Sequence, residues 1–124
     1  MIITELKYTF KEINPFIPLN IQKGTGTFIE TAFESEKGNL ITSEIKIYLP
    51  KITDEHNKLV MDLTGYGAIF QAKVTDGNTY TIGKDELRAN LTFERKLADN
   101  PGGRSGYNIK INWKSLSGSK MEVL

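Results

Sequence analysis

The chain contains no cysteine among its 124 residues, a single histidine and only four prolines. The absence of cysteine excludes a disulfide framework, a thiolate zinc site and a cysteine nucleophile. Lysine plus arginine number 16 and aspartate plus glutamate 15, so the net charge of +1 predicts no general attraction to nucleic acid or to an anionic membrane. No stretch approaches the roughly 20 apolar residues that a membrane span needs. These absences favour neither a redox protein nor a membrane protein.

The composition is that of an ordinary globular protein, with 39% hydrophobic and 25% charged residues. The length predicts a single β domain over residues 1–124. The opening segment Met1–Lys7 has no basic region and no long apolar run, because Glu5 and Lys7 interrupt it. We therefore expect a soluble protein made in the cytoplasm.

Apolar residues alternate with polar ones along most of the chain, which is the period-2 pattern of half-buried strands. Pro15 and Pro18 interrupt the first ladder, and Glu36–Asn39 is typical of a turn between two strands. Asp76-Gly77 predicts a two-residue hairpin turn. The residues expected to face the core are Ile2, Leu6, Tyr8, Phe10; Ile29, Phe33; Ile41, Ile45, Ile47, Leu49; Tyr66, Ala68, Phe70, Ala72, Val74; Leu87, Ala89, Leu91, Phe93, Leu97; and Tyr107, Ile109, Ile111, Trp113.

One segment, Thr53–Leu63, has the features of a short helix. Thr53 can cap the free amides, while Asp54 and Glu55 suit the positive end of the helix dipole. Thr64-Gly65 is expected to end it. Together with the strand pattern, this predicts a mainly β fold: an antiparallel β-sandwich or barrel of about seven to eight strands with one short helix.

The glycine-rich stretch Asp99–Gly106, DNPGGRSG, is the candidate contact site. A phosphate-binding loop lies between a strand and a helix, whereas this stretch lies between two alternating segments. It is therefore interpreted as the tip of a long hairpin, and the resemblance described below implies that this tip contacts partner proteins. Its members are Asp99, Asn100, Pro101, Gly102, Gly103, Arg104, Ser105 and Gly106.

Catalytic and metal-binding patterns are weak in this sequence. His56 has acidic neighbours in Asp54 and Glu55, but adjacent helical residues point in different directions. Glu30, Glu34 and Glu44 alternate with apolar residues, as any solvent-facing set does. We predict no catalytic residue, no metal and no cofactor, and hence no enzyme; a glycan-binding or hydrolytic domain with paired carboxylates stays an alternative.

A set of turns and strands in the second half carries a family resemblance. Its parts are Gly77-Asn-Thr-Tyr-Thr-Ile-Gly83, Leu87-Arg-Ala-Asn-Leu-Thr-Phe93, Gly102-Gly-Arg-Ser-Gly-Tyr107 and Ile109-Lys-Ile-Asn-Trp113. In this layout, which extends over residues 40–114, the chain resembles small virion structural proteins. These are encoded among the head–tail and tail genes of phages and prophages of Bacteroidetes-type bacteria.

The resemblance implies a non-enzymatic subunit of the tail or head–tail junction. Such a protein would form a homo-oligomeric ring around the DNA passage and contact other virion proteins, with no specific nucleic-acid sequence and no membrane as partner. Its location would be the virion. The alternative is a β-barrel binding module for single-stranded nucleic acid or a small ligand, with aromatic residues as the stacking surface.

Overall fold

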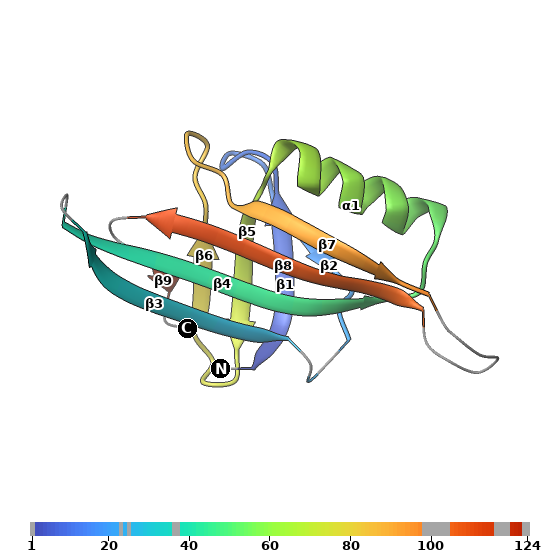
Figure 1. Cartoon of the computed structure of the whole chain (residues 1–124), viewed down its shortest axis with the longest axis horizontal. Coiled ribbons are helices and arrows are strands. Elements are labelled where there is room, and N and C mark those ends of the chain that lie inside the picture. Colours follow the sequence, from blue (N-terminus) through green and yellow to red (C-terminus); the bar gives the residue numbers. More distant parts are fainter. Residues whose placement is uncertain are drawn as a thin grey trace.

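The computed structural model describes residues 2–22, 24, 26–35, 38–97, 105–115 and 120–122. Within these residues the fold is mainly β, with two antiparallel sheets packed together and one helix (Figure 1). The elements are β1 (Ile3–Thr9), β2 (Ile17–Leu19), β3 (Thr27–Ser35), β4 (Gly38–Pro50), α1 (Asp54–Tyr66), β5 (Ile69–Val74), β6 (Thr79–Ile82), β7 (Asn90–Lys96), β8 (Gly106–Ser115) and β9 (Lys120–Glu122).

The strands divide into a front sheet and a back sheet, named from their positions in Figure 1. The front sheet has the order β3-β4-β8-β7, and the back sheet has the order β2-β1-β5-β6-β9. The front strands run across the view, whereas β1, β5 and β6 run up and down behind them. The prediction of a sandwich or barrel is thus confirmed as a sandwich, because the two sheets do not close into one barrel.

One hydrophobic core fills the space between the sheets. Strand β8 contributes Tyr107, Ile109, Ile111 and Trp113, all at most 4% exposed, so the predicted inner face of this strand is confirmed. The inward side of β4 holds Ile45, Ile47 and Leu49, again as predicted. From the back sheet come Leu6, Tyr8, Phe70, Ala72, Val74 and Ile82.

The helix α1 lies along the open side of the sandwich, next to β7 (Figure 1). Thr53 caps it, since its hydroxyl oxygen accepts from the His56 amide at 3.1 Å, and Val60 and Leu63 face the core. Burial first, and then the negative charge of Asp62, raise the pKa of Tyr8 above its ordinary value.

The helix continues past its predicted end at Thr64-Gly65. The Thr64 hydroxyl donates to the Val60 carbonyl at 2.8 Å, so this side chain is accommodated inside the last turn. The helix ends at Tyr66, and Gly67, with φ 68°, leads the chain into the back sheet. Tyr66 is therefore helical and 70% exposed, and the prediction that it faces the core was wrong.

The predicted inner face of β3 and the predicted burial of Ile2 were also wrong. In β3, Phe28 is buried and Ile29 is 55% exposed, because pairing with β4 places Phe28 opposite Ile45 on the inner face. In β1, an irregularity between Ile3 and Glu5 shifts the register. Ile3 is consequently buried, and Ile2 is 45% exposed.

The ends of two further segments differ from the prediction. The β5–β6 hairpin forms, but its loop has three residues, Thr75–Gly77: the Gly77 amide donates to the Val74 carbonyl at 3.0 Å and Gly77 has φ 89°. Leu87 and Leu97, expected in the core, are 51% and 66% exposed because they lie outside β7.

Candidate functional site

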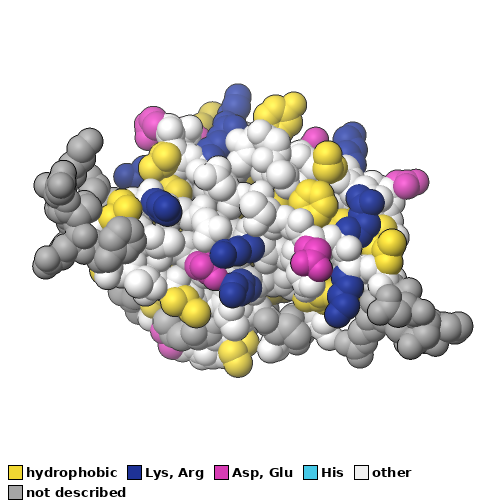
Figure 2. Space-filling model, in the orientation of Figure 1, with side chains coloured by type: hydrophobic (Ala, Val, Ile, Leu, Met, Phe, Trp, Pro, Cys, Tyr) yellow, Lys and Arg dark blue, Asp and Glu magenta, His cyan; other side chains and the backbone are white. Residues whose placement is uncertain are grey.

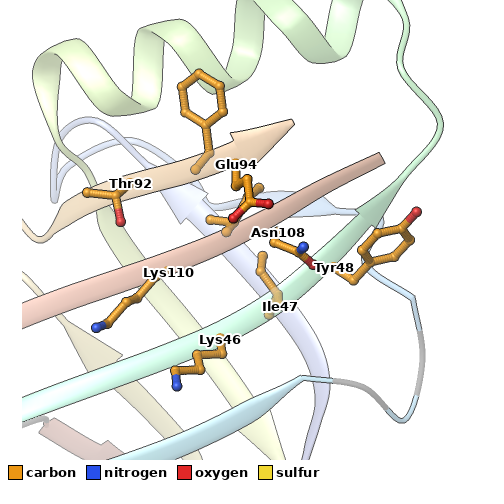
Figure 3. A pocket seen from close by; sticks show the side chains of 9 residues that line it. Lys46, Ile47, Tyr48, Thr92, Glu94, Asn108 and Lys110 are labelled. Carbon is orange, nitrogen blue, oxygen red and sulfur yellow. The ribbon is translucent and has the colours of Figure 1, made fainter. Parts of the chain in front are cut away.

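The outer face of the front sheet has a shallow hollow of about 580 Å³, formed by β4, β7 and β8 (Figure 3). Strand pairing brings its polar side chains into rows. Lys46 lies opposite Lys110, which lies opposite Thr92 on the next strand. Tyr48 lies opposite Asn108, which lies opposite Glu94. The hollow is therefore lined by two adjacent rows, one basic and one carrying an aromatic ring, an amide and a carboxylate.

The two lysines of the hollow share one carboxylate. Glu44 Oε1 is 3.4 Å from Lys46 Nζ, and Glu44 Oε2 is 3.8 Å from Lys110 Nζ. These are exposed pairs, so each stabilises the fold by at most about 1 kcal/mol. Directly opposed like charges on neighbouring strands are unfavourable, and one carboxylate offsets the repulsion between two ammonium groups only in part. Figure 2 shows basic side chains beside acidic ones near the middle of the face that it views.

Sequence reasoning placed these side chains on the solvent face but did not identify a site. Lys46 and Tyr48 were expected opposite the core face of their strand, and Glu94, Asn108 and Lys110 likewise. What brings them together is the strand order β4-β8-β7 and its register. The order of strands in a sheet cannot be deduced from one sequence. No pattern within a single strand could therefore predict that these side chains lie together.

Most of the predicted contact site lies outside the described residues: Asp99, Asn100, Pro101, Gly102, Gly103 and Arg104. Its last two members are described. The Ser105 carbonyl accepts from the Lys51 amide at 3.0 Å, and Gly106 is buried at the start of β8. The base of the predicted tip thus packs against the end of β4. The partner-binding role of the eight residues stays a prediction.

His56 and the glutamates considered as catalytic candidates do not come together in one site. His56 Nδ1 lies 2.8 Å from the Lys51 carbonyl at the start of α1. The Glu30 carboxylate accepts from Ser43 on the inner side of the front sheet at 3.1 Å, whereas Glu44 is on the outer side. Two of the three carboxylates considered for glycoside chemistry therefore point to opposite faces; the side chain of Glu34 lies outside the described residues.

Three of the aromatic residues that could serve as a stacking surface are core residues instead. Phe70, Tyr107 and Trp113 are at most 4% exposed, and the Trp113 indole donates to the Leu87 carbonyl at 3.0 Å. Tyr80 stacks on Phe28 with ring centroids 5.2 Å apart. Tyr48 lines the hollow, as does Phe93.

A second surface feature is a set of exposed apolar side chains on three neighbouring segments at one end of the sandwich. Ile13, Tyr66 and Leu87 are 87%, 70% and 51% exposed. The Glu12 amide donates to Asp85 at 2.9 Å, and Arg88 Nη1 donates to the Tyr66 carbonyl at 3.5 Å, so the three segments lie side by side. In Figure 1 this is the upper end, where the β1–β2 and β6–β7 connections approach the end of α1. We call Ile13, Tyr66 and Leu87 the loop-end patch.

Comparison with protein-family models, with curated proteins and with solved structures gave no match to this chain. In the part of the chain that the structure describes, no helix has the length and apolar character to cross a membrane. Among the same residues, no three histidine or acidic side chains come together as a metal-binding group.

Proposed function

We propose that this protein is a non-enzymatic virion structural subunit of a phage or prophage, which assembles with copies of itself into a ring at the tail or the head–tail junction. The proposal combines the resemblance of residues 40–114 with one structural observation, the loop-end patch. Large apolar side chains held together at one end of a small domain are typical of a surface that contacts another protein.

The geometry of the patch favours a head-to-tail contact. It lies at one end of the sandwich, so that a neighbouring copy can place a different surface against it. Contacts of this kind close into rings when the rotation between copies permits. The predicted tip Asp99–Gly106 is the candidate for the opposing surface.

Replacing Ile13 and Leu87 together by serine is expected to weaken assembly at least about tenfold, because both side chains would lose their apolar contacts in the ring. The measurement is native mass by light scattering across a concentration series. The wild type is expected to rise from the 14.0 kDa monomer to a ring of defined mass.

Met61→Ser is the matched control, because Met61 is 58% exposed but lies on α1 outside the loop-end patch. It is expected to assemble like the wild type. Equal assembly of all three proteins would remove the role of the patch. A wild type that stays monomeric over the whole range would contradict the ring.

The hollow favours a second candidate function, the binding of single-stranded nucleic acid on the outer face of the front sheet. The alternative predicted from the sequence was a β-barrel binding module. This fold has no open barrel interior, because side chains fill the space between the two sheets. The hollow offers Lys46 and Lys110 for phosphate groups and Tyr48 for stacking, the two elements that such binders combine.

Replacing both Lys46 and Lys110 by glutamine is expected to weaken the binding of a fluorescent oligonucleotide and to lower its salt dependence by about one unit of log–log slope per lysine. Fluorescence anisotropy at several salt concentrations measures both. Lys58→Gln, on the exposed side of α1, is the single-charge control. Absence of binding by the wild type, or an equal loss in the control, would contradict this candidate.

A further inference from the structure

Arg88 is a cation at the border of the loop-end patch that uses few of its hydrogen-bond donors. The residue is partly buried and lies at the end of the β6–β7 connection. Its Nη1 donates to the Tyr66 carbonyl at 3.5 Å, close to the upper limit for a hydrogen bond. The ion pairs of the described residues join Glu44 to two lysines, and neither includes Arg88. A guanidinium group has five donors, so most donors of Arg88 have no protein partner in this part of the chain.

The Nε atom of Arg88 is buried and has no hydrogen-bond partner among the described residues. Buried N–H groups are nearly always paired, because an unpaired one loses the hydrogen bond that water would give it. The stem of the side chain is also confined, since a Cβ atom at Gly67 would lie 3.1 Å from the Arg88 Cβ. Arg88 is thus a charged group whose stem is confined and whose donors are not matched by acceptors of the described chain.

The end of α1 explains the position of Arg88 only in part. The last turn of α1 contains no basic residue, and a cation near the carbonyl end of a helix is favourable. Arg88 supplies such a cation through its contact with the Tyr66 carbonyl. That contact uses one donor, and a helix end carries only about half of a negative charge. The guanidinium group therefore keeps both positive charge and donors for a second contact.

The apolar neighbours of Arg88 belong to the loop-end patch. Tyr66 supplies the carbonyl that Arg88 contacts, and Leu87 precedes Arg88 in the chain; the side chains of Tyr66 and Leu87 are both more than half exposed. Figure 1 shows the β6–β7 connection next to the end of α1, the two segments to which these three residues belong. Tyrosine and arginine are both enriched among the residues that contribute most to protein interfaces. The patch thus combines apolar surface with an unpaired cation.

A protein that covers the loop-end patch also removes water from Arg88. A cation that loses water without gaining a partner weakens such a contact strongly. A carboxylate is the acceptor that best matches a guanidinium group, because two parallel N–H···O bonds form between opposite charges. Residues 84–88, KDELR, carry two positive and two negative charges, so this loop has no general attraction for a polyanion. The chemistry therefore favours a single carboxylate of a protein as the partner of Arg88.

We propose that Arg88 and the loop-end patch form one docking site for a carboxylate that a neighbouring copy of this chain presents beside apolar side chains. The inference deepens the proposed function and rests on it, because the neighbouring copy in the ring is the docking protein. It adds the chemistry of the contact: Arg88 selects an acidic side chain with apolar neighbours. A purely apolar surface would leave Arg88 covered and unpaired, and such a surface would be rejected.

Arg88→Gln tests the site by light scattering across a concentration series. It is expected to weaken assembly at least about tenfold, because the carboxylate of the neighbouring copy would lose its cation. Lys84→Gln is the matched control, because it removes the same charge from the same loop. Lys84 is exposed, and its hydrogen bonds to Leu87 are made by backbone atoms, which the substitution keeps. This control is expected to change assembly by less than about twofold.

Wild-type assembly by Arg88→Gln, or an equal loss in Lys84→Gln, would overturn the proposal and leave the ring in place. Thermal unfolding shows whether Arg88→Gln folds as the wild type does. Arg88→Lys is the second variant, because it keeps a cation near the end of α1 but lacks the planar fork that binds a carboxylate through two bonds. It is expected to assemble better than Arg88→Gln and less well than the wild type.

A small probe tests the carboxylate without any assembly. The nuclear magnetic resonance signal of the Arg88 Nε–H group is followed in isotope-labelled wild type, at a concentration where light scattering shows the 14.0 kDa monomer. N-acetyl-leucine is expected to shift this signal to saturation, and N-acetyl-leucine amide, which has the same apolar group without the charge, to bind at least about tenfold more weakly. Equal binding of the two probes, or no shift with either, would overturn the proposal. Because the probe needs no ring, a monomeric wild type contradicts the ring while this titration still decides the carboxylate site.

Discussion

The variant Tyr107→Ala is expected to lose about 3–5 kcal/mol of the free energy of unfolding, the range for removal of a large buried aromatic side chain. Tyr107 is fully buried near the start of β8, on the inner face of the front sheet. Its ring meets Phe93 edge to face at a centroid distance of 6.0 Å, and its hydroxyl donates to Asn57 of α1. The side chain thus joins β7, β8 and α1.

Two further variants show which part of the Tyr107 side chain stabilises the fold. One removes only its hydroxyl, and the other removes an exposed tyrosine as a control. Tyr107→Phe keeps the ring and removes the hydroxyl that donates to Asn57, and we expect a loss of about 1 kcal/mol. Tyr66→Ala changes a tyrosine that is 70% exposed, so its effect should lie within about 0.5 kcal/mol.

Urea unfolding followed by the fluorescence of Trp113, the single buried tryptophan, measures all three. If Tyr107→Ala had the same free energy of unfolding as the wild type, the Tyr107 ring would not stabilise the packing of β7, β8 and α1. Because a domain of this size is stable by only about 5–15 kcal/mol, the predicted loss is large enough to populate the unfolded state under mild conditions.

Strands with two long neighbours were the most predictable from the sequence. In β8 the alternation from Tyr107 to Trp113 identified every inward residue, because β4 and β7 fix both sides of the strand. The same alternation identified the inner face of β4. In both strands one face is apolar and the other polar, so a one-residue slip would expose the whole apolar set.

The sequence was least informative for edge strands and for the ends of elements. In β3, apolar residues occur on both faces, at Phe28 and at Ile29, so a period of two cannot choose between them. Only the register with β4 decides that Phe28 is inside. The exposure of Ile29 was missed for the same reason.

The hollow and the loop-end patch depend on tertiary structure. Lys46 and Lys110 are far apart in the sequence and become neighbours only through pairing of β4 with β8. Ile13, Tyr66 and Leu87 come from three segments that meet through hydrogen bonds of Glu12 and Arg88. No periodicity within one segment reports such proximity, because each segment supplies a single side chain.

The variant Gly106→Ala is expected to lose about 1–3 kcal/mol of the free energy of unfolding, the usual cost of forcing an extra group into a packed site. A Cβ atom at this position would lie 2.6 Å from the Leu49 carbonyl oxygen and 2.5 Å from the Tyr48 hydroxyl. The carbonyl belongs to β4, which pairs with β8 at this end, so it cannot move without disturbing the ladder. The expected loss arises from this close approach of two strands.

Gly65→Ala is the matched control, with the opposite sign. Gly65 lies in the last turn of α1, and a Cβ atom there would meet nothing within 4 Å. Alanine should therefore stabilise the protein by up to about 1 kcal/mol, because glycine loses more backbone entropy in a helix. Thermal unfolding of the two variants beside the wild type measures both changes. If Gly106→Ala proved as stable as Gly65→Ala, β4 and β8 would have room to separate at this end, and the base of the Asp99–Gly106 tip would be less tightly packed than the structure has it.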